Sequence, residues 1–131
     1  ASGQAILALR PEDHLRSFIK ELRRTNANID SDKINWLYKG LELARTEGIG
    51  LDFEELFKGI RCVAGPVFDD AGQIVATISC SVPTVRLDRT LSQKLLREIP
   101  LAAAEASRLL EAPERTFQLD LEAISEKLMA L

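Results

Sequence analysis

The sequence predicts an α+β fold, with one antiparallel hairpin surrounded by helices. Residues 59–83 contain two apolar runs, 60–68 and 73–83, both rich in the β-branched residues typical of strands. The Asp-Asp-Ala-Gly sequence between them, residues 69–72, is typical of a tight turn. Elsewhere the apolar residues mostly recur at helical spacing. A lone hairpin is marginal as a sheet, so we expect companion strands, upstream of Ala1.

Length and composition limit the possible functions. A length of 131 residues fits one domain. The net charge of −3 argues against this chain holding a nucleic-acid backbone by itself, because phosphate binding needs a basic surface. No apolar run approaches the roughly 18 residues of a membrane span, and no signal-peptide pattern is present. We therefore expect a cytoplasmic protein that does not bind membranes.

The elements before the hairpin follow from caps and spacing. A short helix over 2–9 ends at Arg10-Pro11, because the residue before proline is pushed out of the helical region. A second, amphipathic helix follows from Pro11 to Arg24, and a third runs from Asp30 or Ser31 to Gly48. Residues 49–53 alternate like a short strand, and 54–58 form a loop or a single helical turn.

Two helices are predicted after the hairpin. The first runs from Asp88 or Thr90 to about Glu111, with Pro100 expected to kink it. Its expected buried stripe is Leu91, Leu95, Ile99, Ala102, Ala106, Leu109 and Leu110. The tail repeats apolar residues at spacings of four and three, which is too short a pattern for a coiled coil: Phe117, Leu121, Ile124, Leu128 and Leu131. It docks either on its own domain or on a partner chain.

The residues offer little for catalysis. The single histidine, His14, lies on the polar side of its helix, where we expect it to be solvated. No motif for a metalloprotease, a phosphate loop, a redox dithiol or a serine hydrolase is present. Cys62 lacks an activating neighbour, because Arg61 points to the opposite face of the strand. We predict no catalytic residue, no metal site and no cofactor. The two cysteines could bridge, but we expect them to be reduced.

A binding site has more support. Ser79 and Ser81 share one face of their strand, and Ile60 and Cys62 share a face of the neighbouring strand. Asp52 lies on the short strand before them. Together these residues could line one pocket, with apolar walls and a few convergent polar groups. The alternative, that both serines merely face solvent, stays open at this point.

Three blocks in this order and spacing resemble one known family. They are Gly3-Gln4-Ala5-Ile6-Leu7-Ala8, the segment from Glu47 to Glu55, and the hairpin Gly59–Pro83 with its Arg61-Cys62 and Ser79-Cys80-Ser81-Val82-Pro83 sequences. The chain resembles the C-terminal effector-binding domain of IclR-type transcriptional regulators over about residues 1–111. Gln4 stands where the family usually has Lys, Val82 where Gly is common, and Cys80 where an apolar residue is usual.

The resemblance implies a GAF-like antiparallel sheet flanked by helices. It implies an effector-binding domain over residues 1–112, here without its N-terminal strands. Residues 113–131 lie beyond the usual end of the family, and their apolar spacing predicts an amphipathic helical extension. The resemblance also implies a winged helix-turn-helix domain further upstream, through which alone the protein would contact DNA, and assembly as a homodimer or homotetramer. The implied effectors are small organic or aromatic acids, held by residues matching Asp52, Ile60, Cys62, Ser79 and Ser81, with Ala1 and Ser2 closing one side.

Three functional hypotheses follow. The first is a small-molecule sensing domain of a transcriptional regulator, which the resemblance favours. The second is a dimerisation module that binds no ligand. The third is a small thiol-dependent enzyme using Cys62 and Cys80. The effector, and repression against activation, stay open.

Overall fold

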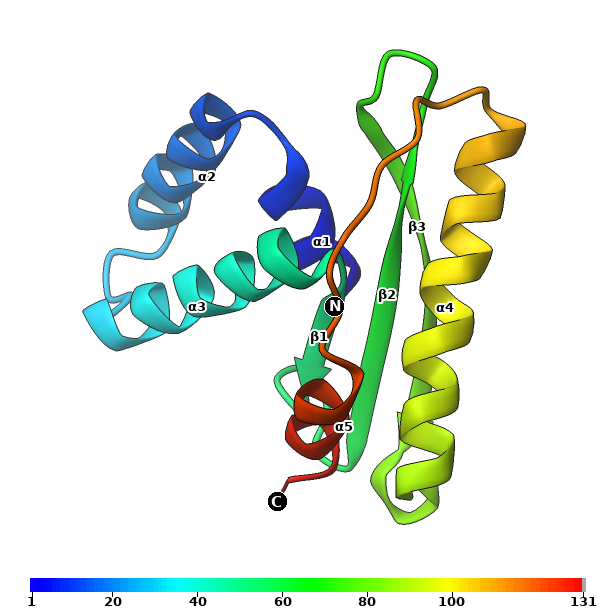
Figure 1. The fold of residues 1–131 in the computed structure, drawn as a ribbon. Helices are drawn as coiled ribbons and strands as arrows, with labels where there is room; N and C mark the ends of the chain where they lie inside the picture. The colour runs from blue at the N-terminus through cyan, green and yellow to red at the C-terminus, as the bar shows by residue number, and fades with distance from the viewer. Residues whose placement is uncertain (131) are drawn as a thin grey trace.

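The sheet has three antiparallel strands in the order β1-β2-β3, and the computed structural model describes residues 1–130 (Figure 1). The strands are β1, Gly50–Phe53, β2, Ile60–Phe68, and β3, Ile74–Pro83. The β2–β3 turn is closed by Asp69, whose Oδ1 accepts hydrogen bonds from the backbone N–H groups of Ala71 and Gln73 at 3.0 and 2.9 Å. Gly72 takes the left-handed conformation that this turn requires, with φ of 73°.

Three N-terminal helices lie on one side of the sheet. They are α1, Ser2–Leu9, α2, Glu12–Thr25, and α3, Ser31–Glu47. Helix α1 contacts all three strands, while α2 and α3 project from the sheet as a helical pair (Figure 1). These helices share a small core of their own: Ala8, Leu15, Ile19, Leu41 and Ala44. The predicted α3 stop is confirmed, because Gly48 adopts φ of 71° after the last turn.

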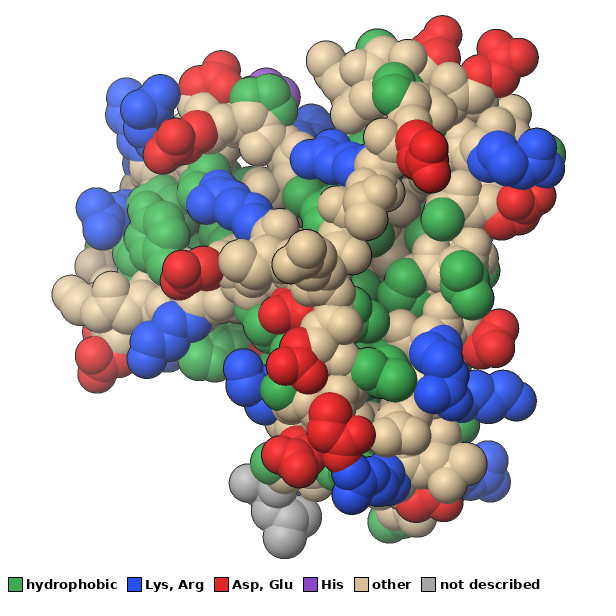
Figure 2. All heavy atoms as spheres, viewed as in Figure 1, with side chains coloured by type: hydrophobic (Ala, Val, Ile, Leu, Met, Phe, Trp, Pro, Cys, Tyr) green, Lys and Arg blue, Asp and Glu red, His purple; other side chains and the backbone are tan. Residues whose placement is uncertain are grey.

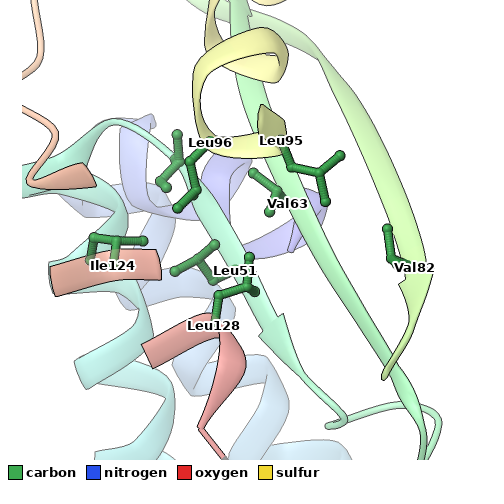
Figure 3. Close-up of a cluster of buried hydrophobic side chains, with 8 residues drawn as sticks. Leu51, Val63, Val82, Leu95, Leu96, Ile124 and Leu128 are labelled. Atoms are coloured by element: carbon green, nitrogen blue, oxygen red, sulfur yellow. The ribbon is translucent and has the colours of Figure 1, made fainter. Parts of the chain in front are cut away.

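The opposite face of the sheet, called here the rear face, is covered by α4, Arg89–Leu109, and α5, Leu121–Met129, after a short 3-10 turn, η1, at Thr84–Arg86. The main core lies between these layers, and Figure 3 shows most of its side chains converging from β1, β2, β3, α4 and α5. Its buried members are Ile49, Leu51, Val63, Val82, Leu95, Leu96, Ile124 and Leu128. One continuous core therefore includes the C-terminal helix.

The buried stripe of α4 differs from the predicted one. Leu95 is buried as expected, but Leu109 and Leu110 are exposed, and the buried face continues through Ala103 and Ser107 rather than Ala102 and Ala106. Gly65 of β2 explains the position of Ala103, because a Cβ at Gly65 would lie 2.8 Å from the Ala103 methyl group. The helix continues through Pro100 as one uninterrupted element.

Two serines of α4, Ser92 and Ser107, are also buried, and each has a hydrogen-bond partner. The buried Ser107 hydroxyl donates to the Ala103 carbonyl at 2.9 Å and accepts from the Phe68 backbone N–H at 3.0 Å. Ser92 lies 3.1 Å, Oγ to Oγ, from Ser125 of α5. Buried hydroxyls are tolerated when they are paired in this way.

The tail docks on its own domain in this structure. Phe117 fills a notch above Gly48, where an added Cβ would lie only 2.1 Å from the Phe117 ring. The Arg115 guanidinium lies 4.5 Å from the Phe68 ring centroid and 5.4 Å from that of Phe117. The extended segment then leads to α5, whose Ile124 and Leu128 are each 1% exposed. Of the two tail alternatives, the fold shows the docked one.

Candidate functional site

The strand register brings most of the predicted site residues to one face of the sheet, called here the α1 face. Asp52 lies opposite Cys62 across β1 and β2, and Cys62 lies opposite Ser81 across β2 and β3. These three side chains therefore form one row, because directly paired residues point to the same side of a sheet. Ser79 lies in the next row, opposite Ala64, and Ile60 lies at the end, opposite Pro83.

Helix α1 covers part of this face and brings the chain's first residues to it. A Cβ at Gly50 would lie 2.2 Å from the Ala1 carbonyl oxygen, so only glycine allows this approach. Ala5 is fully buried against the sheet. Ala1 therefore lies at the Gly50 end of the rows, with Ser2 next to it at the start of α1.

The rest of the α1 face is open. Ser79 and Ser81 are exposed, Ile60 is 38% exposed, and Asp52 and Cys62 are half-buried. The site is a shallow wall rather than an enclosed pocket within residues 1–130. The two β3 serines do face solvent here, as the alternative interpretation held, but they do so beside Cys62 and Asp52 and not in isolation.

An acidic pair closes the β1 end of the face. The Asp52 Oδ1 atom accepts a hydrogen bond from the Glu55 backbone N–H at 2.9 Å, which fixes the Asp52 carboxylate at the strand end. Partial burial and then the negative charge of Asp52 raise the pKa of Glu55 to about 7. Gln4 of α1 donates to Glu55 Oε2 at 3.3 Å. The acidic pair at this end of the face is therefore contacted by the neutral amide of Gln4.

Gln4 and Glu55 were missed as site residues by sequence reasoning. Their contact joins positions 51 residues apart, so no local pattern indicates it. The available signal was indirect: the departure at Gln4 and the Glu54-Glu55 pair both lie in segments that resemble the family. Those segments now meet at one end of the α1 face.

The geometry gives little support to thiol chemistry. Cys62 and Cys80 are both free, and they lie on opposite faces, because Cys62 pairs with Ser81 whereas Cys80 pairs with Val63. His14 is exposed on α2 and lines a cavity with Ile74 and Val75, at the other end of β3 from Ser81. No group of three metal-ligating side chains occurs among residues 1–130. Arg61 points to the rear face, as predicted.

Arg61 instead joins the sheet to the tail. It is 6% exposed, and its guanidinium Nη1 donates to the Leu128 carbonyl near the end of α5. Its Nε lies 3.9 Å from a Glu54 carboxylate oxygen. A cation at a helix C-terminus is stabilised by the last carbonyl groups. We therefore regard Arg61 as a residue that holds the loop and α5 in place.

Two cavities lie away from the Asp52–Cys62–Ser81 row. A cavity of about 560 Å³ lies between α1, α2 and α3, with mainly apolar walls that include Ile6, Leu7 and Phe18. Figure 2 shows apolar side chains gathered over the α2–α3 pair. A second cavity, of about 550 Å³, lies under the tail between Phe68, Leu101 and Phe117. In the described part of the chain, no helix is long and apolar enough to cross a bilayer.

Comparison with known proteins identifies relatives of most of the chain. Residues 1–108 match the family described as bacterial transcriptional regulator IclR C-terminal. The HTH-type transcriptional regulator KdgR of Escherichia coli is 34% identical over 110 residues, which are 82% of this chain and 41% of that protein. The HTH-type transcriptional repressor AllR of Salmonella typhimurium is 39% identical over 102 residues, 74% of this chain and 37% of that protein. The chain thus spans about two fifths of the length of these relatives.

Solved structures agree with the sequence comparison. The crystal structure of the C-terminal domain of E. coli KdgR matches with a TM-score of 0.70 and 32% identity, covering 85% of this chain and 68% of that one. The Thermotoga maritima IclR structure matches with a TM-score of 0.69 and 30% identity, covering 83% and 44%. The predicted α+β class and the family resemblance are confirmed, and the named relatives are transcriptional regulators, which agrees with the expectation of a non-enzyme. The chain belongs to the IclR C-terminal family of bacterial transcriptional regulators.

Proposed function

We propose that this chain senses a small organic acid on the α1 face and that binding controls a DNA-binding region elsewhere in the protein. The observation that carries the proposal is the row formed by Asp52, Cys62 and Ser81, with Ser79 beside it. It places hydroxyl donors at one end and a fixed carboxylate at the other, on a wall of small side chains. Such a wall with a few convergent polar groups suits a small polar ligand.

The two ends of the row favour different parts of a ligand. The Ser79 and Ser81 hydroxyls can donate to a carboxylate, and a hydrogen bond to a charged acceptor is stronger than a neutral one. The acidic end would repel that carboxylate. Asp52 Oδ1 is occupied by the Glu55 N–H, which leaves Oδ2 to accept from a ligand hydroxyl. We therefore propose a hydroxy acid, with its carboxylate toward β3 and a hydroxyl toward β1.

The wider setting of the domain is part of the same proposal. The relatives are named HTH-type regulators, and the acidic balance of this chain, −3, does not suit DNA binding. We propose that DNA contact is made by a helix-turn-helix region, in a cytoplasmic homodimer or homotetramer. The effector would act by binding one arrangement of the subunits more tightly than another.

Titration calorimetry with small hydroxy, keto and aromatic carboxylic acids tests whether the protein binds a ligand of this class. The double variant Ser79→Ala, Ser81→Ala should lower affinity at least about tenfold, because removal of two donors to a carboxylate costs more than about 1.4 kcal/mol. Val75→Ala, on β3 but outside the row, is the control and should bind as before. If no acid binds the unmutated protein, or if the double variant binds acids equally well, the proposal that this face senses an acid is wrong. A dimerisation module that binds no ligand then becomes the better description.

A further inference from the structure

The tail, α4 and the end of β2 enclose a cavity of about 550 Å³. Its lining lies within residues 66–68 of β2, 100–108 of α4 and 112–117 of the tail, together with Gly48. The volume falls within the roughly 300–1,000 Å³ that is usual for small-ligand sites. The family match ends at residue 108, so the wall formed by the tail lies outside the matched region, and the cavity is separate from the α1 face.

The walls of this cavity are fixed by contacts made outside the space itself. The Phe117 ring fills the notch above Gly48, where an added Cβ would lie 2.1 Å from the ring. The Phe68 backbone N–H donates to the Ser107 hydroxyl at 3.0 Å, which ties the end of β2 to α4. Protein interiors are close-packed and leave few voids larger than a water molecule. This one persists because its walls are held apart by their own packing.

The α4 side of the cavity presents an apolar surface. Leu101 is 64% exposed, and Pro100 and Ala104 line the cavity beside it. Pro66 of β2 belongs to the same lining, and neither proline has a backbone N–H to donate. A polar group buried against this surface without a hydrogen-bond partner would be costly, whereas an apolar ring gains free energy by leaving water. This side of the cavity therefore suits a flat hydrocarbon group.

The tail side of the cavity supplies a cation. Arg108 is neutralised by Glu105, to which it donates two hydrogen bonds, from Nε at 2.9 Å and from Nη2 at 2.6 Å. Arg115 makes no ion pair with any of residues 1–130, and its guanidinium lies over the rings of Phe68 and Phe117. A guanidinium stacked on a ring keeps its N–H donors in its own plane, where they can bind both oxygens of a carboxylate.

We propose that the cavity under the tail binds an aromatic carboxylate, with the carboxylate on Arg115 and the ring against Leu101 and Ala104. Glu114 also lines the cavity, and its charge opposes an anion there. A ligand hydroxyl would find no ready partner in Ser107, whose own hydroxyl already donates one hydrogen bond and accepts another. The ligand class therefore differs from the hydroxy acid proposed for the α1 face, and the proposal does not rest on the sensing role of that face.

Titration calorimetry of the protein with 2-naphthoate tests the charge contact. Arg115→Gln should weaken binding at least about tenfold, because the carboxylate loses its bidentate partner. Glu114→Gln should tighten binding about threefold, because it removes a like charge near the carboxylate. Arg97→Gln, on the exposed side of α4 and outside the lining, is the control and should bind as before. Opposite signs at neighbouring positions distinguish a charge contact from a loosened tail, which would weaken binding in both variants.

A second pair of variants tests the place of binding. Ala104→Phe puts a ring into the cavity and should weaken 2-naphthoate binding at least about tenfold. Ala102→Phe makes the same change at another exposed position of α4, outside the lining, and should bind as the unmutated protein does. Circular dichroism checks that both variants are folded. 2-Naphthamide, which has the same ring without the charge, should bind at least about tenfold more weakly than 2-naphthoate.

The outcomes separate this site from the α1 face. The double variant Ser79→Ala, Ser81→Ala should bind 2-naphthoate as before. Loss of binding in that variant would place the aromatic acid on the α1 face, which overturns this proposal and leaves the sensing role standing. The proposal is also overturned if 2-naphthoate does not bind, if 2-naphthamide binds equally well, or if the two phenylalanine variants bind alike.

Discussion

At the scale of single residues, Glu55 links the candidate site to pH. Its carboxyl is held near Asp52 and Gln4 on the α1 face, and partial burial followed by the Asp52 charge raises its pKa from 4.5 to about 7. The unfolded chain releases this proton at lower pH than the folded chain does. The contribution of Glu55 to the free energy of unfolding is therefore fully present below about pH 4.5 and is lost as pH rises toward about 7.

We predict that Glu55→Gln flattens this part of the pH dependence. The amide cannot ionise, so chemical denaturation at about pH 5 and about pH 8 should show a smaller loss of stability for the variant than for the native chain. Gln4→Lys should also reduce the loss, because a cation next to Glu55 favours its charged form. Glu98→Gln, on the exposed side of α4, is the control. If Glu55→Gln keeps the native slope, the carboxyl does not titrate in this range.

The residue scale also shows what sequence patterns could and could not predict about the site. The period-2 rule placed Ser79 and Ser81 on one face, and Arg61 opposite Cys62, because alternation depends only on the strand itself. The row from Asp52 to Ser81 needed the register between strands. The contact between Gln4 and Glu55 needed the packing of α1 on the sheet, which is a tertiary property that local spacing does not encode.

At the scale of elements, Gly48 sets the junction between α3, β1 and the tail. It ends α3 with φ of 71°, and it also leaves the space that the Phe117 ring fills. A methyl group there would be strained in the left-handed conformation, a cost of about 1–2 kcal/mol, and would displace the ring as well. We predict that Gly48→Ala lowers the free energy of unfolding by about 2 kcal/mol or more.

Gly3→Ala is the matched control for that measurement. Gly3 lies within α1, and a Cβ there meets no atom within 4 Å. The same substitution should stabilise the chain by about 0.5–1 kcal/mol, because alanine loses less backbone entropy in a helix. Opposite signs from one chemical change would confirm that glycine is required at this junction. A neutral Gly48→Ala variant would contradict both the left-handed conformation and the filled notch.

The elements themselves were predicted better than their contacts. The helices and the hairpin follow from spacing, caps and turn residues, which are local. The buried stripe of α4 was predicted from apolarity alone, and it failed at Ser92 and Ser107, whose burial depends on hydrogen bonds to Ser125 and Phe68. The pattern also counted Leu109 and Leu110 as buried, although both are exposed at the end of α4.

At the scale of the whole molecule, the tail belongs to the core although the family match stops at residue 108. Ile124 and Leu128 of α5 pack with Leu51, Val63 and Leu96 from the matched region (Figure 3). Arg61 reaches the Leu128 carbonyl from the sheet. The expected division at residue 112 therefore separates two segments that share buried surface, and we expect their unfolding to be cooperative.

We predict that Leu128→Ala lowers the free energy of unfolding by about 2–5 kcal/mol, a large part of the 5–15 kcal/mol typical of a domain. The leucine is 1% exposed, so its removal leaves a cavity against Leu51 and Val63. Leu109→Ala makes the same chemical change at a position that is 68% exposed, and it should alter stability by less than about 0.5 kcal/mol. Urea denaturation followed by circular dichroism, which reports the helices as a whole, and by Trp36 fluorescence, which reports α3, should give one coincident transition for both variants, because we expect the N-terminal helices, the sheet and α5 to unfold together. A Leu128→Ala variant as stable as Leu109→Ala would contradict the docking of the tail. If α5 were detached from the sheet in solution, Leu128 would be exposed, and its truncation would not lower the free energy of unfolding.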